Sequence, residues 1–303
     1  MTGPAIPDTL GNDARLDHTS EGARAICRLP VVDLHAEENE GPSVSVGTQL
    51  MRGETARVLS VGRDAHAGWL RVACDHDRYI GWARRVAFDL PDGDGEGREP
   101  ESRRREPPGP THTVAVPRTF LYPAPDLARR PAVATLPLGA RVSVRRSLTV
   151  RNTSYGVLDD GRAIVDRHLA PLGTLARDPV AIAELLLHTP YLWGGRTALG
   201  IDCSGLVQLC HALCGHMTLR DSDQLEASFG EELQTSFDRD GVPKRRLERG
   251  DLVFWRGHVA MARDADTLIH ASAHAMAVAI EPVADTVRRI APLYGQPTSI
   301  RRA

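Results

Sequence analysis

Short runs of β-branched and aromatic residues, separated by turns, fill most of the first half of the chain. In residues 25–88 the runs are V-S-V at 44–46, A-R-V-L-S-V at 56–61, W-L-R-V at 69–72 and Y-I-G-W-A at 79–83. In residues 111–172 they are T-V-A-V at 113–116, A-R-V-S-V at 140–144, Y-G-V-L at 155–158 and A-I-V at 163–165. Several short strands at this spacing are typical of small barrels. The pattern therefore predicts two small β-barrels, and the phrase L-P-L-G-A-R-V-S-V in the second echoes M-R-G-E-T-A-R-V-L-S-V in the first.

Two polar segments flank the first predicted barrel. Residues 1–24 show little apolar periodicity and are interpreted as a lead-in. Residues 89–110 contain almost no apolar residue and many Pro, Gly and charged residues, a composition that predicts a linker. The basic run Arg103-Arg104-Arg105 lies between acids and prolines, which favours a solvated linker over a nucleic-acid contact.

From residue 173 to residue 303 the pattern predicts a third domain of the α+β class. A helix is expected from Pro179 to His188, where Thr189-Pro190 ends it. A second helix follows Gly205, with apolar residues at helical spacing up to Cys214. After Gly250 the runs D-L-V-F-W, H-V-A-M-A, T-L-I-H-A-S and A-V-A-I-E-P-V indicate strands. The expected order is helices first, then an antiparallel sheet.

Composition limits the binding partners and the cellular compartment that we expect for this chain. With 37 basic and 39 acidic residues the net charge is −2, which gives no general electrostatic case for binding nucleic acid or an anionic membrane. No basic segment followed by an apolar one opens the chain, and no run is long enough to span a bilayer. Five cysteines at scattered spacings argue against a disulfide framework. We therefore expect a cytoplasmic protein.

The stretch Y-L-W-G-G-R-T-A-L-G-I-D-C-S-G-L places Cys203 at or next to the start of the second helix. Backbone N–H groups and the helix dipole at that position favour a thiolate over a thiol. Cys203 is therefore a candidate nucleophile.

Two histidines stand out as candidate bases. His258 begins the strand H-V-A-M-A, and His270 lies inside T-L-I-H-A-S. A hairpin centred on Asp264 places the two directly opposite one another, on one face of the sheet. His258 would take the thiol proton and His270 would fix its tautomer. A slip of one residue would separate them, and two unrelated histidines in a hairpin is the alternative.

Together these motifs resemble the NlpC-type cell-wall peptidases, which are papain-like cysteine peptidases. The resemblance rests on Y-L-W-G-G, G-I-D-C-S-G-L, R-G-D-L-V-F-W, H-V-A-M and L-I-H-A-S, and covers residues 173–303. It implies Cys203 as nucleophile, His258 as base and His270 as the orienting residue, with no metal or cofactor. It also implies hydrolysis of the γ-D-glutamyl–diamino acid bond in peptidoglycan stem peptides.

The segments before this domain resemble the bacterial SH3-like barrels that often precede it. In related proteins that recycle murein peptides, the first barrel closes one end of the cleft and selects a free N-terminal L-alanine. By this resemblance Asp202, Glu54 and Tyr79 bind the substrate ammonium. The remaining cleft residues are Tyr191, Trp193, Ser204 and Ser222. Asp202 has the alternative role of a helix N-cap, and Tyr79 that of a barrel-core residue.

Three other interpretations stay open. Cys210 and Cys214, with His211 and His216 nearby, could hold a metal, although the chain lacks a second ligand pair at zinc-finger spacing. The barrels could make the chain a non-enzymatic wall-binding module. A related amidase or acyltransferase chemistry would use the same motifs on another substrate. The sequence also leaves open the oligomeric state and the choice between diaminopimelate and lysine.

Overall fold

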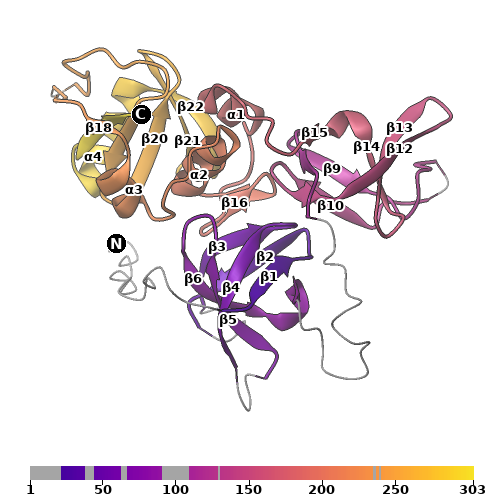
Figure 1. The fold of residues 1–303 in the computed structure, drawn as a ribbon. Helices are drawn as coiled ribbons and strands as arrows, with labels where there is room; N and C mark the ends of the chain where they lie inside the picture. The colour runs from indigo at the N-terminus through magenta and orange to yellow at the C-terminus, as the bar shows by residue number, and fades with distance from the viewer. Residues whose placement is uncertain are drawn as a thin grey trace.

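Two β-rich units precede an α+β domain in the computed structural model (Figure 1). The structure describes residues 22–37, 44–62, 67–90, 109–128, 130–234, 237–238 and 240–303. The predicted lead-in and linker, including the Arg103–Arg105 run, therefore lie almost wholly outside the described residues.

The first unit is one antiparallel sheet of seven strands in the order β3-β2-β6-β5-β4-β1-β7. The strands are β1 (Arg24–Cys27), β2 (Val31–His35), β3 (Val46–Met51), β4 (Thr55–Val61), β5 (Trp69–Cys74), β6 (Ile80–Arg84) and β7 (Phe88–Asp89), with a 3₁₀ turn at Arg85–Ala87. Alternation of buried and less buried positions directs Leu34, Leu70 and Val72 into a common core. The predicted strands at 56–61, 69–72 and 79–83 are present, whereas the run at 44–46 mostly precedes β3.

The second unit consists of three small antiparallel sheets, β10-β9, β11-β8-β15 and β12-β13-β14. Their strands are β8 (His112–Val114), β9 (Arg118–Leu121), β10 (Ala134–Pro137), β11 (Arg141–Val142), β12 (Val144–Val150), β13 (Thr153–Leu158), β14 (Ala163–Val165) and β15 (Leu169–Pro171), with a 3₁₀ turn at Asp166–His168. The echoed phrases place Gly53 and Gly139 at equivalent turns, with φ of 78° and 90°, a region that favours glycine. Two β-rich units accord with the predicted pair of SH3-like folds, whose boundaries stay predictions.

The C-terminal domain packs helices against a six-stranded antiparallel sheet in the order β18-β23-β19-β20-β21-β22. Its elements are α1 (Pro179–Leu185), β16 (Arg196–Thr197), β17 (Gly200–Ile201), α2 (Cys203–Leu213), α3 (Ser222–Ser228), β18 (Glu231–Glu232), β19 (Leu252–Trp255), β20 (His258–Ala262), β21 (Thr267–Ser272), β22 (Ala277–Pro282), α4 (Val283–Tyr294) and β23 (Ser299–Arg302). Helix α2 packs on β20 and β21, which brings its N-terminus to the two histidine-bearing strands. Among the described helices, none has the length and apolar character needed to cross a membrane.

The structure corrects two details of the predicted C-terminal domain. Helix α1 begins as expected, with the Asp178 carboxylate accepting hydrogen bonds from the N–H groups of Val180 and Ala181, but it ends at Leu185. His188 has a φ of 64° and lies outside the helix. The order of helices first and sheet second is also wrong, because α4 and β23 follow β22.

Candidate active site

Cys203 is the first residue of α2 and lies at the junction of the helix with the sheet. Its side chain is buried, with 7% of the residue exposed. The residues before it form the turn and the short β16–β17 hairpin that lead into the helix. The N–H of Val259, directly after His258, hydrogen-bonds the Cys203 sulfur, as does the N–H of Ser204. The helix start and strand β20 thus bring the candidate nucleophile to the strand that begins with the candidate base, His258.

The protonation state of Cys203 differs from the sequence expectation. Burial, with a smaller contribution from the neighbouring Asp202 carboxylate, raises the pKa of the thiol to about 12. The backbone N–H groups and Arg220 act in the opposite direction but do not outweigh burial. The resting nucleophile is therefore a thiol and not a preformed thiolate, so a base must accept its proton.

His258 and His270 are in direct contact, as predicted, although in a different register. Their Nε2 and Nδ1 atoms lie 2.8 Å apart. Met261 pairs with Ile269 and Ala262 with Leu268, two residues from the predicted register. Because side chains alternate between faces with a period of two, this shift keeps both histidines on one face as diagonal neighbours.

His258 is suited to accept the thiol proton. Burial, with smaller contributions from His270 and Arg289, lowers the pKa of its imidazole to about 3. The ring is therefore neutral at physiological pH. Since Nε2 is engaged with His270, Nδ1 is the nitrogen that remains for the thiol.

Glu281 continues this chain of contacts and was missed from the sequence. It lies on β22, next to β21, and its Oε2 is 3.0 Å from His270 Nε2. The hydrogen bond to His270 lowers the pKa of the Glu281 carboxyl to about 2. One signal was available in the sequence, because Glu281 is the charged residue in the run A-V-A-I-E-P-V.

Asp202 is the N-cap of α2 and the partner of a buried arginine. Its Oδ1 accepts from the N–H of Gly205 at 2.7 Å, and its Oδ2 accepts from the N–H of Gly194 at 2.9 Å. Arg220 donates to both oxygens, at 3.0 and 2.6 Å. Together with the Ser204 hydroxyl, which donates to Oδ1 at 3.4 Å, these bonds fill the acceptor capacity of a carboxylate. The N-cap role considered from the sequence is present, and the predicted contact with a substrate ammonium has no free acceptor on Asp202 in this geometry.

Glu54 is held by a different arginine, Arg196. Arg196 Nη1 donates to its two carboxylate oxygens at 3.0 and 2.9 Å, and the N–H of Met51 donates to Oε2 at 2.8 Å. Burial, the largest single influence, would raise the pKa of Glu54, but Arg196, His76 and the N–H of Met51 together outweigh it and the pKa is lowered. Glu54 thus joins the first unit to the C-terminal domain, and its predicted role in binding the ammonium lacks support from the geometry.

Of the other predicted cleft residues, Ser204 and Tyr191 lie beside these ion pairs. Ser204 accepts from Arg220 at 2.8 Å, and Tyr191 lies close enough to Cys203 for the two to interact electrostatically. Trp193 is 62% exposed. Ser222 begins α3, directly after Asp221.

Tyr79 brings the first unit to the same region. Burial raises the pKa of its hydroxyl to about 12, and Asp221 adds to the effect. A Cβ on Gly194, whose φ is 75°, would lie 2.2 Å from the carbonyl oxygen of Val46. The first unit therefore packs directly on the loop before the nucleophile, and only glycine fits there.

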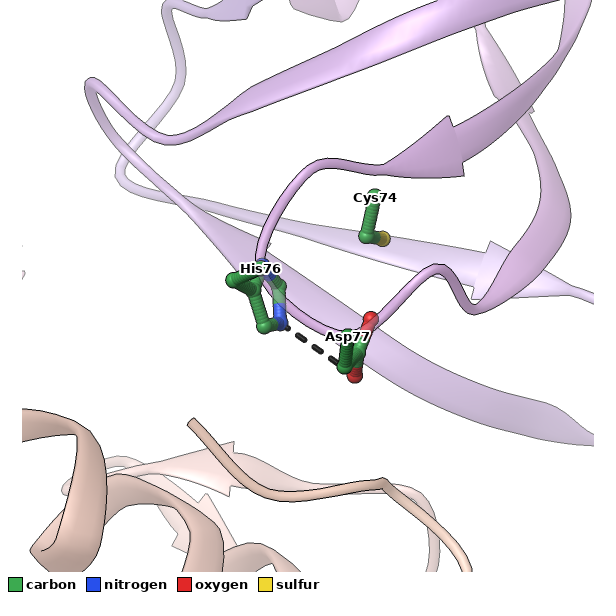
Figure 2. Close-up of side chains that lie close together, drawn as sticks. All are labelled: Cys74, His76 and Asp77. Carbon is green, nitrogen blue, oxygen red and sulfur yellow. Dashed lines mark ion pairs between the residues drawn. The ribbon is translucent and has the colours of Figure 1, made fainter. Parts of the chain in front are cut away.

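Cys74, His76 and Asp77 are a second grouping of potential ligands, and their donor atoms lie within 4.8 Å of one another. Figure 2 shows His76 and Asp77 joined as an ion pair on the turn between β5 and β6, with Cys74 at the end of β5. Asp77 already accepts from the N–H of Tyr79 and from Gln208 of α2, both at 2.9 Å. Its observed role is to tie this turn to the nucleophile helix.

The cysteines considered as metal ligands in α2 lie in the hydrophobic core. Cys210 is 0% exposed and Cys214 is 9% exposed. Both belong to the cluster that packs α2 against the sheet, and burial raises the pKa of each thiol. His211 packs against Phe229, with ring centroids 4.9 Å apart. A role as core residues accounts for both cysteines.

A buried cysteine at a helix start, facing a pair of hydrogen-bonded histidines on an antiparallel sheet, defines a papain-like α+β fold. Residues 188–289 match the NlpC/P60 family. The C-terminal part of this chain is therefore an NlpC/P60 domain, as its motifs predicted.

Curated relatives share this segment. The chain is 37% identical over 93 residues to dipeptidyl-peptidase 6 of Lysinibacillus sphaericus, covering 31% of each protein. It is 33% identical over 81 residues to a gamma-D-glutamyl-L-lysine dipeptidyl-peptidase of Bacillus subtilis, covering 26% of this chain and 24% of that one. The matched segment thus spans about a third or less of these relatives' length.

Solved structures extend the likeness to the whole chain. An NlpC/P60 family protein from Bacillus cereus superposes with a TM-score of 0.65 at 19% identity, covering 92% of this chain and 99% of that one. An NlpC/P60 endopeptidase from Photobacterium damselae gives a TM-score of 0.55 at 12% identity, covering 92% and 70%. At these identities the comparison shows the fold, including the β-rich N-terminal part.

Proposed function

We propose that this protein is a cysteine peptidase that hydrolyses the γ-D-glutamyl–diamino acid bond of peptidoglycan stem peptides. The observation that carries the proposal is the 2.8 Å contact between His258 and His270, beside Cys203 at the start of α2. The NlpC/P60 match and the relatives named as dipeptidyl-peptidases support the substrate class.

In the proposed reaction, His258 Nδ1 accepts the Cys203 proton as the sulfur attacks the γ-carbonyl carbon. The N–H of Cys203, one of the first orphan donors of the helix, is directed toward the developing oxyanion. The His258 imidazolium then protonates the leaving amine, which departs as the diamino acid. Water, activated by the neutral imidazole, hydrolyses the thioester and regenerates the thiol.

The charges around Tyr79 support selection of a peptide with a free N-terminal L-alanine. Four carboxylates, those of Glu54, Asp77, Asp202 and Asp221, interact here with three guanidinium groups, those of Arg141, Arg196 and Arg220. This excess of negative charge favours an ammonium group in the adjoining cleft. Recognition would then act through the field of the cluster, with Asp202 and Glu54 contributing charge while their oxygens stay bonded to arginine.

Release of L-Ala-γ-D-Glu would make this protein an enzyme of cell-wall peptide recycling. We propose that it acts in the cytoplasm. All five cysteines are free thiols, which suits a reducing compartment.

The test uses L-Ala-γ-D-Glu-diaminopimelate, its lysine analogue, an α-linked L-glutamate analogue and the N-acetylated peptide, with products identified by mass. We expect L-Ala-γ-D-Glu from the free γ-linked peptides and about 10²-fold or more lower kcat/KM for the α-linked one, since its scissile carbonyl is displaced from the nucleophile. Cys203→Ala should abolish hydrolysis, and His258→Ala should lower kcat by about 10²–10⁴-fold. Absence of hydrolysis by the folded wild-type protein would overturn the proposed activity. Equal cleavage of the acetylated peptide would overturn only the selection of a free amine.

A further inference from the structure

The geometry points to Glu281 as a positioning residue that fixes which nitrogens of His258 and His270 carry protons. This inference deepens the proposed function and rests on it for its kinetic consequence. His270 and His258 separate Glu281 from Cys203, so its effect would be exerted through the two histidines.

Glu281 is placed for this role by three elements. Strand β22 carries it beside β21, where Leu268 is its cross-strand partner. Its Oε2 lies 3.0 Å from His270 Nε2 and 3.4 Å from the hydroxyl of Thr286 on α4. The guanidinium of Arg289, also on α4, pairs with the same oxygen. His270 itself is 1% exposed, so solvent does not compete for its ring nitrogens.

An ionised carboxylate accepts hydrogen bonds and cannot donate them. His270 Nε2 must therefore carry the proton shared with Glu281. In a neutral ring, Nδ1 of His270 is then an acceptor, and the proton in its 2.8 Å contact with His258 belongs to His258 Nε2. His258 Nδ1 is left with its lone pair, which is the arrangement that a base for Cys203 requires.

The opposite arrangement has the same heavy-atom positions and no catalytic base. If His270 carried its proton on Nδ1, it would donate to His258 Nε2, and His258 Nδ1 would be protonated and unable to accept from the thiol. This alternative places two acceptors, His270 Nε2 and Glu281 Oε2, against each other at 3.0 Å. The carboxylate thereby selects between two arrangements that the histidine pair alone does not distinguish.

Its bonds to His270 and Arg289 keep the Glu281 carboxylate ionised and oriented. Because the hydrogen bond from His270 lowers the carboxyl pKa to about 2, Glu281 remains an acceptor throughout the neutral range. Thr286 also donates to the backbone carbonyl of Pro282 at 2.9 Å, which fixes the start of α4 against the end of β22.

Two variants of Glu281 separate the effect of its hydrogen-bond acceptor from the effect of its negative charge. Glu281→Leu removes the acceptor, and Glu281→Gln keeps an oxygen of similar placement without the charge. Asp285→Asn is the matched control, because it removes a nearby carboxylate, on α4, that forms an exposed pair with Arg288. Thermal melts followed by circular dichroism confirm that each variant is folded.

The direct readout is the ¹⁵N chemical shifts of the histidine ring nitrogens at pH 7 in a Cys203→Ala background, which needs no substrate. We expect the wild-type pair to show His258 protonated at Nε2 and not at Nδ1, and Glu281→Leu to show a mixture of both tautomers. In the catalytic background, Glu281→Leu should lower kcat by about 10²-fold or more with KM within about threefold, as expected when a base is lost and binding is kept. Glu281→Gln should lose less, and Asp285→Asn should match wild type.

An unchanged tautomer in folded Glu281→Leu would overturn the inference, as would wild-type kcat in that variant. Because the spectroscopic result does not depend on turnover, it decides the role of Glu281 even if the protein hydrolyses a different acyl substrate.

Discussion

Arg196, on β16 beside the nucleophile loop, binds both carboxylate oxygens of Glu54 in the first β-rich unit, at 3.0 and 2.9 Å. The arginine is 1% exposed and the glutamate 4% exposed. The backbone N–H of Arg196 also donates to Gln49 of β3 at 2.9 Å. Figure 1 shows the first unit lying against this part of the C-terminal domain. The pair therefore fixes the first β-rich unit to the domain that carries Cys203.

Arg196→Met should destabilise the folded protein by about 3–5 kcal/mol, because it leaves a buried carboxylate without its partner. The additional change Glu54→Leu should recover part of this loss. Urea denaturation measures both. Arg288→Met is the control, since its pair with Asp285 is more than half exposed on both sides and should contribute at most about 1 kcal/mol. Equal effects of the Arg196 and Arg288 variants would contradict the structural role of the buried pair.

Cys203 should react with iodoacetamide as a thiol of high pKa. Because burial raises that pKa to about 12, the thiolate fraction, and with it the alkylation rate, should rise across pH 6–9 by roughly tenfold per unit. Peptide mapping of the alkylated protein follows the rate at Cys203, and Cys203→Ala gives the background from the other four cysteines. A plateau reached below about pH 6 would indicate a resting thiolate and contradict this assignment.

The acid limb of kcat/KM should lie well below the ordinary histidine pKa. The folded-state pKa of His258 is lowered to about 3, so the neutral base persists as the pH falls and is lost only near that value. Between pH 6.5 and pH 5 we expect a decrease of less than about twofold, whereas an unperturbed imidazole would lose more than about tenfold. Initial rates at low substrate concentration measure this. A tenfold decrease in that interval would show that the base titrates normally.

The proposed catalytic trio could be predicted from the sequence because each member lies within a local pattern. Cys203 follows a helix start signal, and His258 and His270 lie in short strands joined by a tight turn. Asp264 accepts from the N–H groups of Asp266 and Thr267 at 3.0 and 2.8 Å, which builds that turn. The predicted register was wrong by two residues, yet an even shift preserves the face and hence the contact.

What sequence reasoning missed depends on contacts between distant segments. Glu54 and Arg196 are separated by 142 positions, so no local pattern shows that the glutamate is already paired. The raised pKa of the Cys203 thiol has a similar origin. Burial by the rest of the fold raises this pKa more than the backbone N–H groups at the helix start lower it. Helix α4 could have been predicted, since Val283, Val287 and Ile290 have helical spacing and all are buried.

Covalent catalysis by Cys203 is the central claim, and partitioning with hydroxylamine tests it most directly. A thioester of L-Ala-γ-D-Glu on Cys203 would be intercepted by the amine, giving the dipeptidyl hydroxamate and the free thiol. The measurement is the ratio of hydroxamate to free L-Ala-γ-D-Glu, by mass, as hydroxylamine is increased. We predict that this ratio rises with hydroxylamine in the wild-type protein and that Cys203→Ala forms neither product. Free dipeptide alone at every hydroxylamine concentration, or hydroxamate formed by Cys203→Ala, would contradict the account.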